Sequence, residues 1–405
     1  MTKRVILAMS VCLFGLAAMA EEPQWLKDAR AREGKPGKAV ELRSKDKWFR
    51  AKVPAKVTDP IEKLEGSYTV SLDIGSEQPT YCEVVPDGFD MADMARRSLE
   101  LMMEQIEKSQ GKVELRALES TDAGVWGNVP YLQAQWIYRV NDGKAQRIGG
   151  LKQVSMEKDG QGIYCLHVDL GYTRSFTAVA RAFAETFTST SPVPAPYYKE
   201  IAVATLNGMK IGITMSTLER DEEGDTKAEE STSMLIPGAS GALHSKDAIH
   251  QQWIRPDASL INATHFIASD GVLKTSLGLT LEDGAWIVKG DLDGKEFSQT
   301  LKADVPPGTW VAQALALRKL LATDNPVGAE HSMQQWAADD PARLTNAKTK
   351  VLARVGDKQF KGMLTAGEMT ANATIDKATG MFAVVEISER GQKVTIERVY
   401  LDGSF

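Results

Sequence analysis

The chain has 405 residues, a length that suits two domains. Its 54 acidic residues outnumber its 48 basic ones, and the net charge of −6 argues against a nucleic-acid partner, whose recognition needs a basic face. Hydrophobic residues make up 43% of the chain, which is ordinary for a globular protein that buries a core.

The first twenty residues have the three parts of a cleavable secretory signal peptide. Lys3 and Arg4 supply positive charge, an apolar run covers 5–19, and Ala18-Met19-Ala20 offers small residues where signal peptidase cuts. The alternative is a transmembrane anchor, but a span needs about 20 apolar residues and this run is shorter. We therefore expect cleavage after Ala20, no transmembrane span afterwards, and a periplasmic or extracellular protein.

Cleavage would leave 385 of the 405 residues and would remove two basic residues but no acidic one, so the net charge would go from −6 to −8. Cys12 would be lost with the signal peptide, and it lacks the preceding small residue of a lipoprotein acylation site. Cys82 and Cys165 would remain, each after a tyrosine in a strand-like run. An even pair in an oxidising compartment predicts a Cys82–Cys165 disulfide. The alternative is a nucleophilic Cys82 activated by His167, although such thiols usually lie at sites such as helix N-termini.

The first half of the mature chain predicts a loose leader and one α+β domain. Residues 21–40 are charged and interrupted by glycine and proline, which is typical of a leader. Over 41–187 the pattern predicts an α/β sandwich with an antiparallel sheet, in which a helix at 91–109 precedes four strands. A second helix closes this domain, and its apolar stripe, at offsets 0, 3, 4, 7 and 11, is interpreted as core packing: Phe176, Val179, Ala180, Phe183 and Phe187.

The second half predicts a linker and a larger β domain. Residues 188–197 contain three prolines among small residues, which favours an extended linker. Over 198–405 the pattern predicts a mostly antiparallel β domain with one amphipathic helix at 309–323. Its expected strands begin at 199, 210, 226, 258, 272, 285, 296, 347, 358, 368, 381 and 392, with turns such as Asn207-Gly208 and Asp283-Gly284.

Two family resemblances follow from these segments. Tyr197-Tyr198, the run 206–212 and the strands at 381–388 and 392–400 resemble a β-rich accessory domain that precedes transglutaminase-like cores in bacterial envelope proteins. The resemblance covers about 198–405 and implies a non-catalytic accessory or binding module, since no Cys-His-Asp core follows. In its order of helices and strands, the first half resembles the α/β sandwich of the PsbP/Mog1 group.

The sequence contains near-matches to catalytic and metal-binding motifs, and each lacks a defining part. The stretch 238–242 places Ser240 in a G-x-S-x-A pattern, one glycine short of a nucleophile elbow. The five histidines form no HExxH motif, and the six-residue spacing of His244 and His250 does not match common zinc spacings. We therefore interpret the histidines, His265 and His331 included, as surface or packing residues. The acidic run 219–225 lacks the ligand spacing of an EF-hand loop and is interpreted as a hairpin tip.

These patterns lead us to predict no catalytic, cofactor-binding or metal-binding residues. The leading hypothesis is an exported envelope protein that acts as a non-catalytic binding or interaction module, either carrying an apolar ligand or binding an envelope protein. The alternative is a periplasmic hydrolase whose site is assembled from residues distant in sequence.

Overall fold

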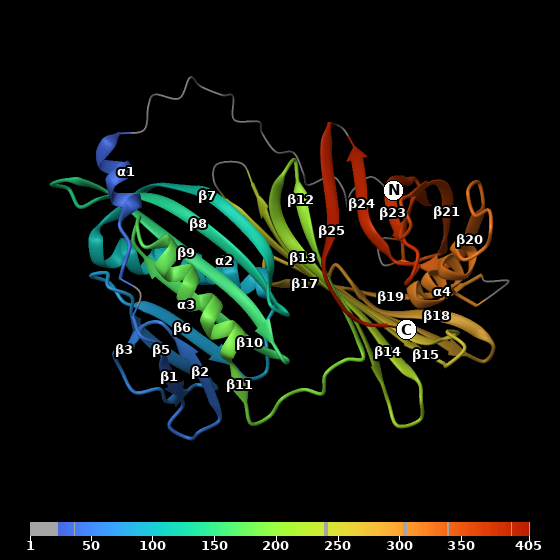
Figure 1. Cartoon of the computed structure of the whole chain (residues 1–405), viewed down its shortest axis with the longest axis horizontal. Helices are drawn as coiled ribbons and strands as arrows, with labels where there is room; N and C mark the ends of the chain where they lie inside the picture. The colour runs from blue at the N-terminus through green and yellow to red at the C-terminus, as the bar shows by residue number, and fades with distance from the viewer. Residues whose placement is uncertain are drawn as a thin grey trace. The chain divides into compact units, whose positions relative to one another are not determined.

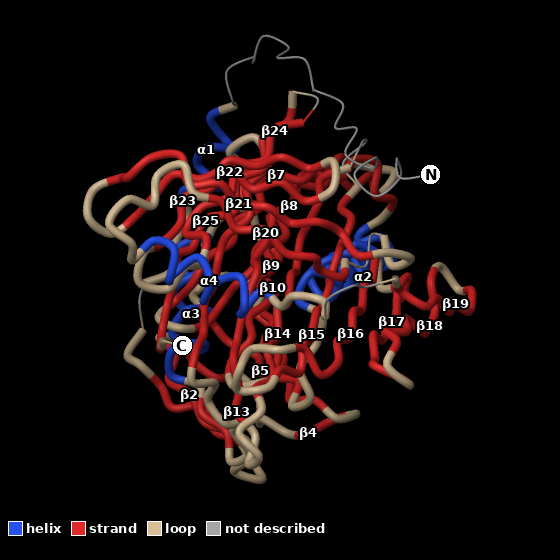
Figure 2. The backbone as a smooth tube through the Cα atoms, turned by 90° about the vertical axis from the view of Figure 1, so that its right-hand side faces the viewer, coloured by secondary structure: helices blue, strands red, loops and turns tan. Residues whose placement is uncertain are grey.

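The computed structural model describes residues 23–35, 37–238, 242–302, 306–337, 340–389 and 391–404. Strands far outnumber helices in it (Figure 2), and the predicted α+β class with a larger β domain is confirmed. Its contacts divide the chain into two compact units, which are described separately here. The N-terminal unit comprises residues up to Pro194 together with 235–245, and the C-terminal unit comprises 195–234 and the residues from Lys246 onward. The expected signal peptide lies outside the described residues.

The N-terminal unit packs helices on antiparallel sheets (Figure 1). Its helices are α1 (Gln24–Ala31), α2 (Met91–Gln110) and α3 (Thr173–Thr186). Its strands are β1 (Val40–Arg43), β2 (Phe49–Val53), β3 (Lys56–Val57), β4 (Lys63–Leu64), β5 (Ser67–Asp73), β6 (Thr80–Val85), β7 (Lys112–Trp126), β8 (Val129–Asn141), β9 (Gln146–Lys158), β10 (Gln161–Val168) and β11 (Thr188–Ser189). The main sheet has the order β3-β5-β6-β10-β9-β8-β7, with β4 beside β5, and a small sheet has the order β1-β2-β11.

A disulfide joins β6 to β10 at the centre of the main sheet. Cys82 and Cys165 are directly paired across these antiparallel strands, with their Cα atoms 4.0 Å apart and their sulfur atoms bonded. The predicted disulfide is therefore confirmed, and it rules out a free thiol at Cys82. Both cysteines are buried in a core with the apolar stripe of α3, which confirms that this stripe packs in the core.

The opposite face of the same two strands carries different side chains. Because successive residues of a strand point to opposite faces, Tyr81, Tyr164 and Leu166 lie on the side away from α3. The strands β8 and β9 carry most of the contacts of α2 with the sheet, and β10 contacts it less. The face of β6 and β10 is thus left partly uncovered.

The segment expected to be a loose leader contains a helix and is bonded to the rest of its unit. Beyond α1, Arg32 forms an ion pair of 2.9 Å with Asp169 and accepts a backbone hydrogen bond from Tyr172. The Glu33 carboxylate accepts the backbone N–H groups of Arg174 and Ser175, each at 2.9 Å. These are N–H groups that a helix start leaves without partners, and the N-cap residue of α3 supplies no side-chain bond.

The C-terminal unit is built from one large antiparallel sheet and α4 (Trp310–Leu321). Its strands are β12 (Tyr198–Leu206), β13 (Met209–Arg220), β14 (Thr226–Pro237), β15 (Leu243–Ile254), β16 (Leu260–Ser269), β17 (Val272–Glu282), β18 (Ala285–Leu292), β19 (Lys295–Leu301), β20 (Glu330–Trp336), β21 (Leu344–Val355), β22 (Gln359–Ala366), β23 (Met369–Asp376), β24 (Phe382–Glu389) and β25 (Gln392–Gly403). The order is β19-β18-β17-β16-β15-β14-β13-β12-β25-β24-β23-β22-β21-β20. The first two residues of the expected linker, Thr188 and Ser189, form β11 by pairing with β2.

In the C-terminal unit, the sequence prediction missed β15 and β20. Strand β15 has little regular alternation, because polar residues occupy both of its faces. Gln252, for example, is buried and accepts a hydrogen bond of 3.3 Å from the backbone N–H of Trp310 at the start of α4. A buried polar residue of this kind is satisfied by a tertiary partner, which local periodicity does not reveal.

Helix α4 packs against two groups of strands in the large sheet. Near its start, Val311 belongs to a core cluster with residues of β12–β20, such as Leu277 and Trp336. Near its end, Leu317 and Leu321 belong to a second cluster with residues of β21–β23. The helix therefore joins two apolar clusters that the sheet alone would leave apart.

A hydrogen-bonded cap and a close approach of the backbone fix the position of α4. The Thr309 hydroxyl caps the helix by accepting the N–H of Ala312 at 3.0 Å, and it donates to the carbonyl of Ala258 at 3.2 Å. Gly380, with φ of +74°, lies in the turn between β23 and β24, where an added Cβ would stand 2.0 Å from the carbonyl oxygen of Ala314. Only glycine permits this approach of the turn to the helix.

An ion-pair network fixes the junction between the first and last strands of the unit. The Arg398 guanidinium on β25 binds Glu200 on β12 at 3.3 Å and Asp376 on β23 at 3.0 Å. The Tyr198 hydroxyl donates to Glu200 at 2.7 Å. All of these side chains are largely buried, so the charges compensate one another rather than being hydrated.

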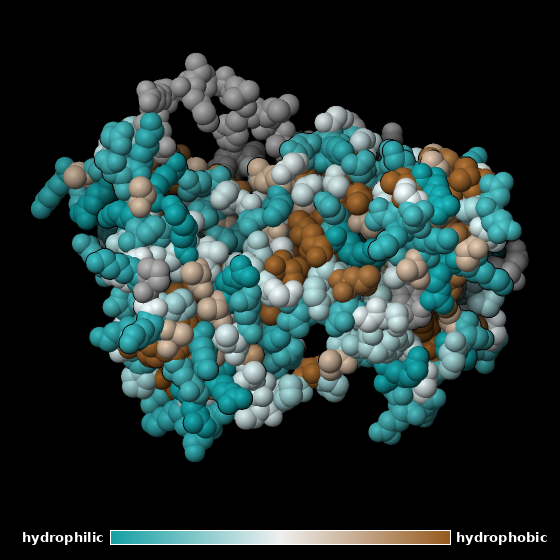
Figure 3. All heavy atoms as spheres, viewed as in Figure 1, coloured by the Kyte–Doolittle hydropathy of each residue, from teal (hydrophilic) through white to brown (hydrophobic). Residues whose placement is uncertain are grey.

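Among the described residues, no helix combines the length and the apolar character that crossing a bilayer requires. On the face drawn in Figure 3 most of the surface residues are hydrophilic.

Removal of the disulfide should destabilise the protein. The bond closes a loop with a sequence separation of 83 residues, for which the chain-entropy model gives about 4 kcal/mol. We expect the Cys82→Ala/Cys165→Ala variant to lose about that much free energy of unfolding in urea titrations. Wild-type protein in reductant is the control and should lose a similar amount. A double variant as stable as the oxidised wild type would contradict this role.

Shortening a side chain of α4 in the second cluster should also destabilise the protein. Leu317 is fully buried, so Leu317→Ala should lower the free energy of unfolding by about 2–5 kcal/mol. Leu352→Ala is the matched control, because Leu352 on β21 is 44% exposed and its loss should change stability by less than about 0.5 kcal/mol. Equal effects in the two variants would argue against the joining role of α4.

Candidate functional site

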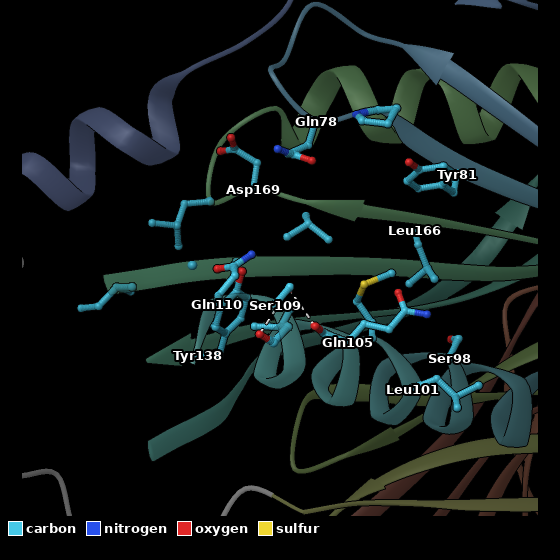
Figure 4. Close-up of a pocket in the computed structure, with 18 of the residues that line it drawn as sticks. Gln78, Tyr81, Ser98, Leu101, Gln105, Ser109, Gln110, Tyr138, Leu166 and Asp169 are labelled. Carbon is cyan, nitrogen blue, oxygen red and sulfur yellow. Dashed lines mark hydrogen bonds between the residues drawn. The ribbon is translucent and has the colours of Figure 1, made fainter. Parts of the chain in front are cut away.

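A pocket of about 620 Å³ lies in the N-terminal unit between α2 and the uncovered face of the main sheet. Figure 4 shows side chains of α2, among them Leu101 and Gln105, on one side and Tyr81 and Leu166 across from them. The pocket is lined by Arg32, Gln78, Pro79, Tyr81, Ser98, Leu101, Met102, Gln105, Ile106, Ser109, Gln110, Tyr138, Ile148, Gly149, Gly150, Tyr164, Leu166, Val168, Asp169 and Leu170.

The lining is apolar and aromatic, with neutral polar groups interspersed. Tyr81 and Leu101 remain 45% and 56% exposed, respectively, although they are large and apolar. Tyr138 is buried, and burial together with the negative charge on Asp169 raises the pKa of its hydroxyl to about 12. This tyrosine is therefore neutral at physiological pH and can offer a hydrogen bond.

The charged side chains of the lining compensate each other. Arg32 and Asp169 are the basic and acidic members of the lining set, and they are bonded at 2.9 Å. The loop that carries Asp169 is held from the other side of the sheet by Lys152, whose ammonium donates to the backbone carbonyls of Asp169 and Gly171. Burial lowers the pKa of Lys152 to about 8, against the opposing effect of nearby acidic charges. Because Arg32 and Asp169 compensate each other, the pocket presents little net charge to a ligand.

The hydroxyl groups in the pocket are not arranged as nucleophiles. On α2, Ser98 donates to the carbonyl of Ala95, and Ser109 donates to the carbonyl of Gln105. An activated serine needs a base within hydrogen-bond reach, whereas these protons are directed to backbone carbonyls of their own helix. The described lining residues include neither histidine nor cysteine.

His167, which the sequence offered as a possible base for Cys82, lies in the core on the α3 side of the sheet. Its Nδ1 is 3.1 Å from the Thr80 hydroxyl, and its ring stacks on Phe176. Burial, and then the charge on Lys152, lower its pKa to about 4. Its Nε2 is buried without a hydrogen-bond partner among the described residues. His167 is thus a neutral core residue, and Cys82 is occupied by the disulfide.

The remaining residues singled out in the sequence lie elsewhere. Ser240 falls outside the described residues, as do 239 and 241. The acidic run forms the turn between β13 and β14, where the Asp221 carboxylate accepts the backbone N–H groups of Glu223 and Asp225. His244 is exposed on β15, and His331 is partly buried on β20.

The structure brings together two histidines that we had interpreted as surface or packing residues. His250 on β15 and His265 on β16 are paired directly, with their Nδ1 atoms 3.0 Å apart. The pair was missed because β15 was not predicted. Counting outward from the turn at Pro256-Asp257 would not have paired them either, because the register of the two strands shifts between Trp253 and Ile254. In the part of the chain that is described, no three potential metal ligands converge.

No family model matches the chain, and no curated protein matches it. One solved structure that it matches is a beta-barrel-like protein of the domain of unknown function DUF1849 from Brucella abortus, with 13% identity and a TM-score of 0.40, covering 51% of this chain and 97% of that one. Another is a DUF1089 family protein from Pseudomonas aeruginosa, with 14% identity and a TM-score of 0.25, covering 48% of this chain and 92% of that one. Neither is a transglutaminase-associated or PsbP/Mog1 protein, so both family resemblances stay predictions.

Burial of neutral His167 should make stability depend on pH. Its pKa is about 4 in the folded protein and 6.5 when unperturbed, so between these values the unfolded chain binds more protons. The contribution of His167 to the free energy of unfolding is fully present above about pH 6.5, and it falls by about 3 kcal/mol as the pH drops to 4. Urea unfolding at about pH 7 and pH 4.5 should therefore show a smaller difference for His167→Gln than for the wild type. The exposed-residue control His244→Gln should keep the wild-type difference, and an unchanged difference in His167→Gln would refute the assignment.

Proposed function

We propose that this protein is an exported, non-catalytic binding module of the bacterial envelope that holds an uncharged, largely apolar ligand in the pocket of the N-terminal unit. The observation that carries the proposal is the character of this pocket. Tyrosines and aliphatic side chains line it together with neutral polar groups, while Arg32 and Asp169 compensate each other. Ligand pockets are typically apolar, with a few polar groups that orient the ligand.

The neutral polar groups of the lining are suited to orienting a bound ligand rather than to catalysing a reaction. Gln105 and Gln110 on α2 and Gln78 before β6 place amide groups around the apolar wall. An amide offers both donors and an acceptor, so these side chains can bind hydroxyl, carbonyl or amide groups of a ligand. The hydrolase alternative has no support in this pocket, because its serine hydroxyls are bonded to helix carbonyls.

Export is part of the proposal for two reasons. The first twenty residues read as a signal peptide. The Cys82–Cys165 disulfide is a bond that oxidising compartments favour and that the bacterial cytoplasm keeps reduced.

A charge placed on the pocket wall should weaken the binding of an apolar ligand. We expect the mature protein to bind the uncharged fluorescent probe N-phenylnaphthylamine with an increase in emission. Leu101→Glu should weaken this binding by about tenfold or more, because it removes an apolar contact and places a charge beside the probe.

Leu115→Glu is the matched control, since Leu115 on β7 is 49% exposed and lies outside the pocket. It should bind the probe as the wild type does. An absence of binding by the wild type, or equal losses in both variants, would contradict the proposed ligand site.

A further inference from the structure

The C-terminal unit contains two imidazole rings whose Nδ1 atoms are about as far apart as two nitrogen ligands of one metal ion. His250 and His265 face each other on neighbouring strands, and their Nδ1 atoms are 3.0 Å apart. Two nitrogens bound to one tetrahedral zinc ion at about 2.0–2.1 Å lie about 3.3 Å from each other. Rotation of both rings, so that the two Nδ1 lone pairs point to one position, would allow both nitrogens to bind one ion.

We propose that His250 and His265 form a binding site for a divalent transition-metal ion such as Zn²⁺, with water completing the coordination. Imidazole nitrogen is a preferred ligand of these ions. In the hydrogen bond between the rings, one Nδ1 carries the proton and the other accepts it. Binding of the ion needs both Nδ1 lone pairs, so the donor ring moves its proton to Nε2. The pair then stays neutral, and binding releases no proton from it.

The pair lies beside the core cluster that contains Val311. His265 is directly paired with Leu277, a buried residue of that cluster. Both histidines are only partly buried, so water and ions can reach them.

A third side chain beside the pair has an unused donor. The Trp336 ring lies 6.1 Å from the His250 ring, and its Nε1 is buried without a hydrogen-bond partner among the described residues. Trp336 is 5% exposed, so the missing partner is not bulk solvent. A water molecule on the metal would offer an acceptor to this N–H group. Such partners in the outer coordination sphere orient the ligands of metal sites.

Calorimetric titration of the mature protein with Zn²⁺, after removal of metals with a chelator, tests the proposal. We expect one ion per chain. His250→Gln and His265→Gln should each weaken binding by at least about tenfold, or about 1.4 kcal/mol. His331→Gln is the control within the same unit and should bind as the wild type does. Mg²⁺ should produce no comparable heat, because it prefers oxygen ligands.

A measurement on the wild type keeps the test independent of how the variants fold. Zn²⁺ should shift the ring resonances of two of the five histidines in NMR spectra, and the same two should be those lost in His250→Gln and His265→Gln. The proposal is overturned if the wild type binds no Zn²⁺. It is also overturned if the doubly substituted protein binds Zn²⁺ like the wild type, or if other histidines shift.

Discussion

The two-residue alternation along β6 and β10 is the constraint on which the N-terminal unit depends. The same strands place Cys82 and Cys165 in the core under α3 and Tyr164 and Leu166 on the opposite face, in the wall of the pocket. A shift of one residue in their pairing would exchange these two faces. Because the disulfide joins residues that are directly opposite each other, it excludes such a shift. Core and pocket are therefore fixed by one pairing register.

A helix serves the corresponding purpose in the C-terminal unit. The apolar side chains of a large antiparallel sheet need cover on at least one face, and α4 supplies it for two clusters at once through Val311 and Leu317. The cap at Thr309 and the close approach of Gly380 fix where the helix lies along the sheet. The ion pairs of Arg398 join the two strands at which the unit begins and ends. Apolar packing thus positions the helix, while buried charges specify the strand junction.

Several parts of this structure could be predicted from the sequence, because their causes are local. The helix at 91–109, the apolar stripe from Phe176 to Phe187 and most strands follow from periodicity and turns. Other parts depend on partners that are distant along the chain. The pocket combines Arg32 of the leader with residues of α2 and of the sheet, up to Asp169. The histidine pair depends on β15, in which polar residues on both faces leave no regular alternation. Distant contacts of this kind leave no periodic signal in one sequence.

The strand order of the C-terminal unit has a consequence for how its chain could be rearranged. Every pair of neighbours in the large sheet is consecutive in sequence except β12 and β25, which are the first and last strands of the unit. Tyr198 and Gly403, at their ends, are directly paired. A circular permutation that joined these ends and opened the chain between β19 and α4 would make every pairing local. Such a chain would keep the same contacts but have a lower contact order, and proteins with low contact order fold faster.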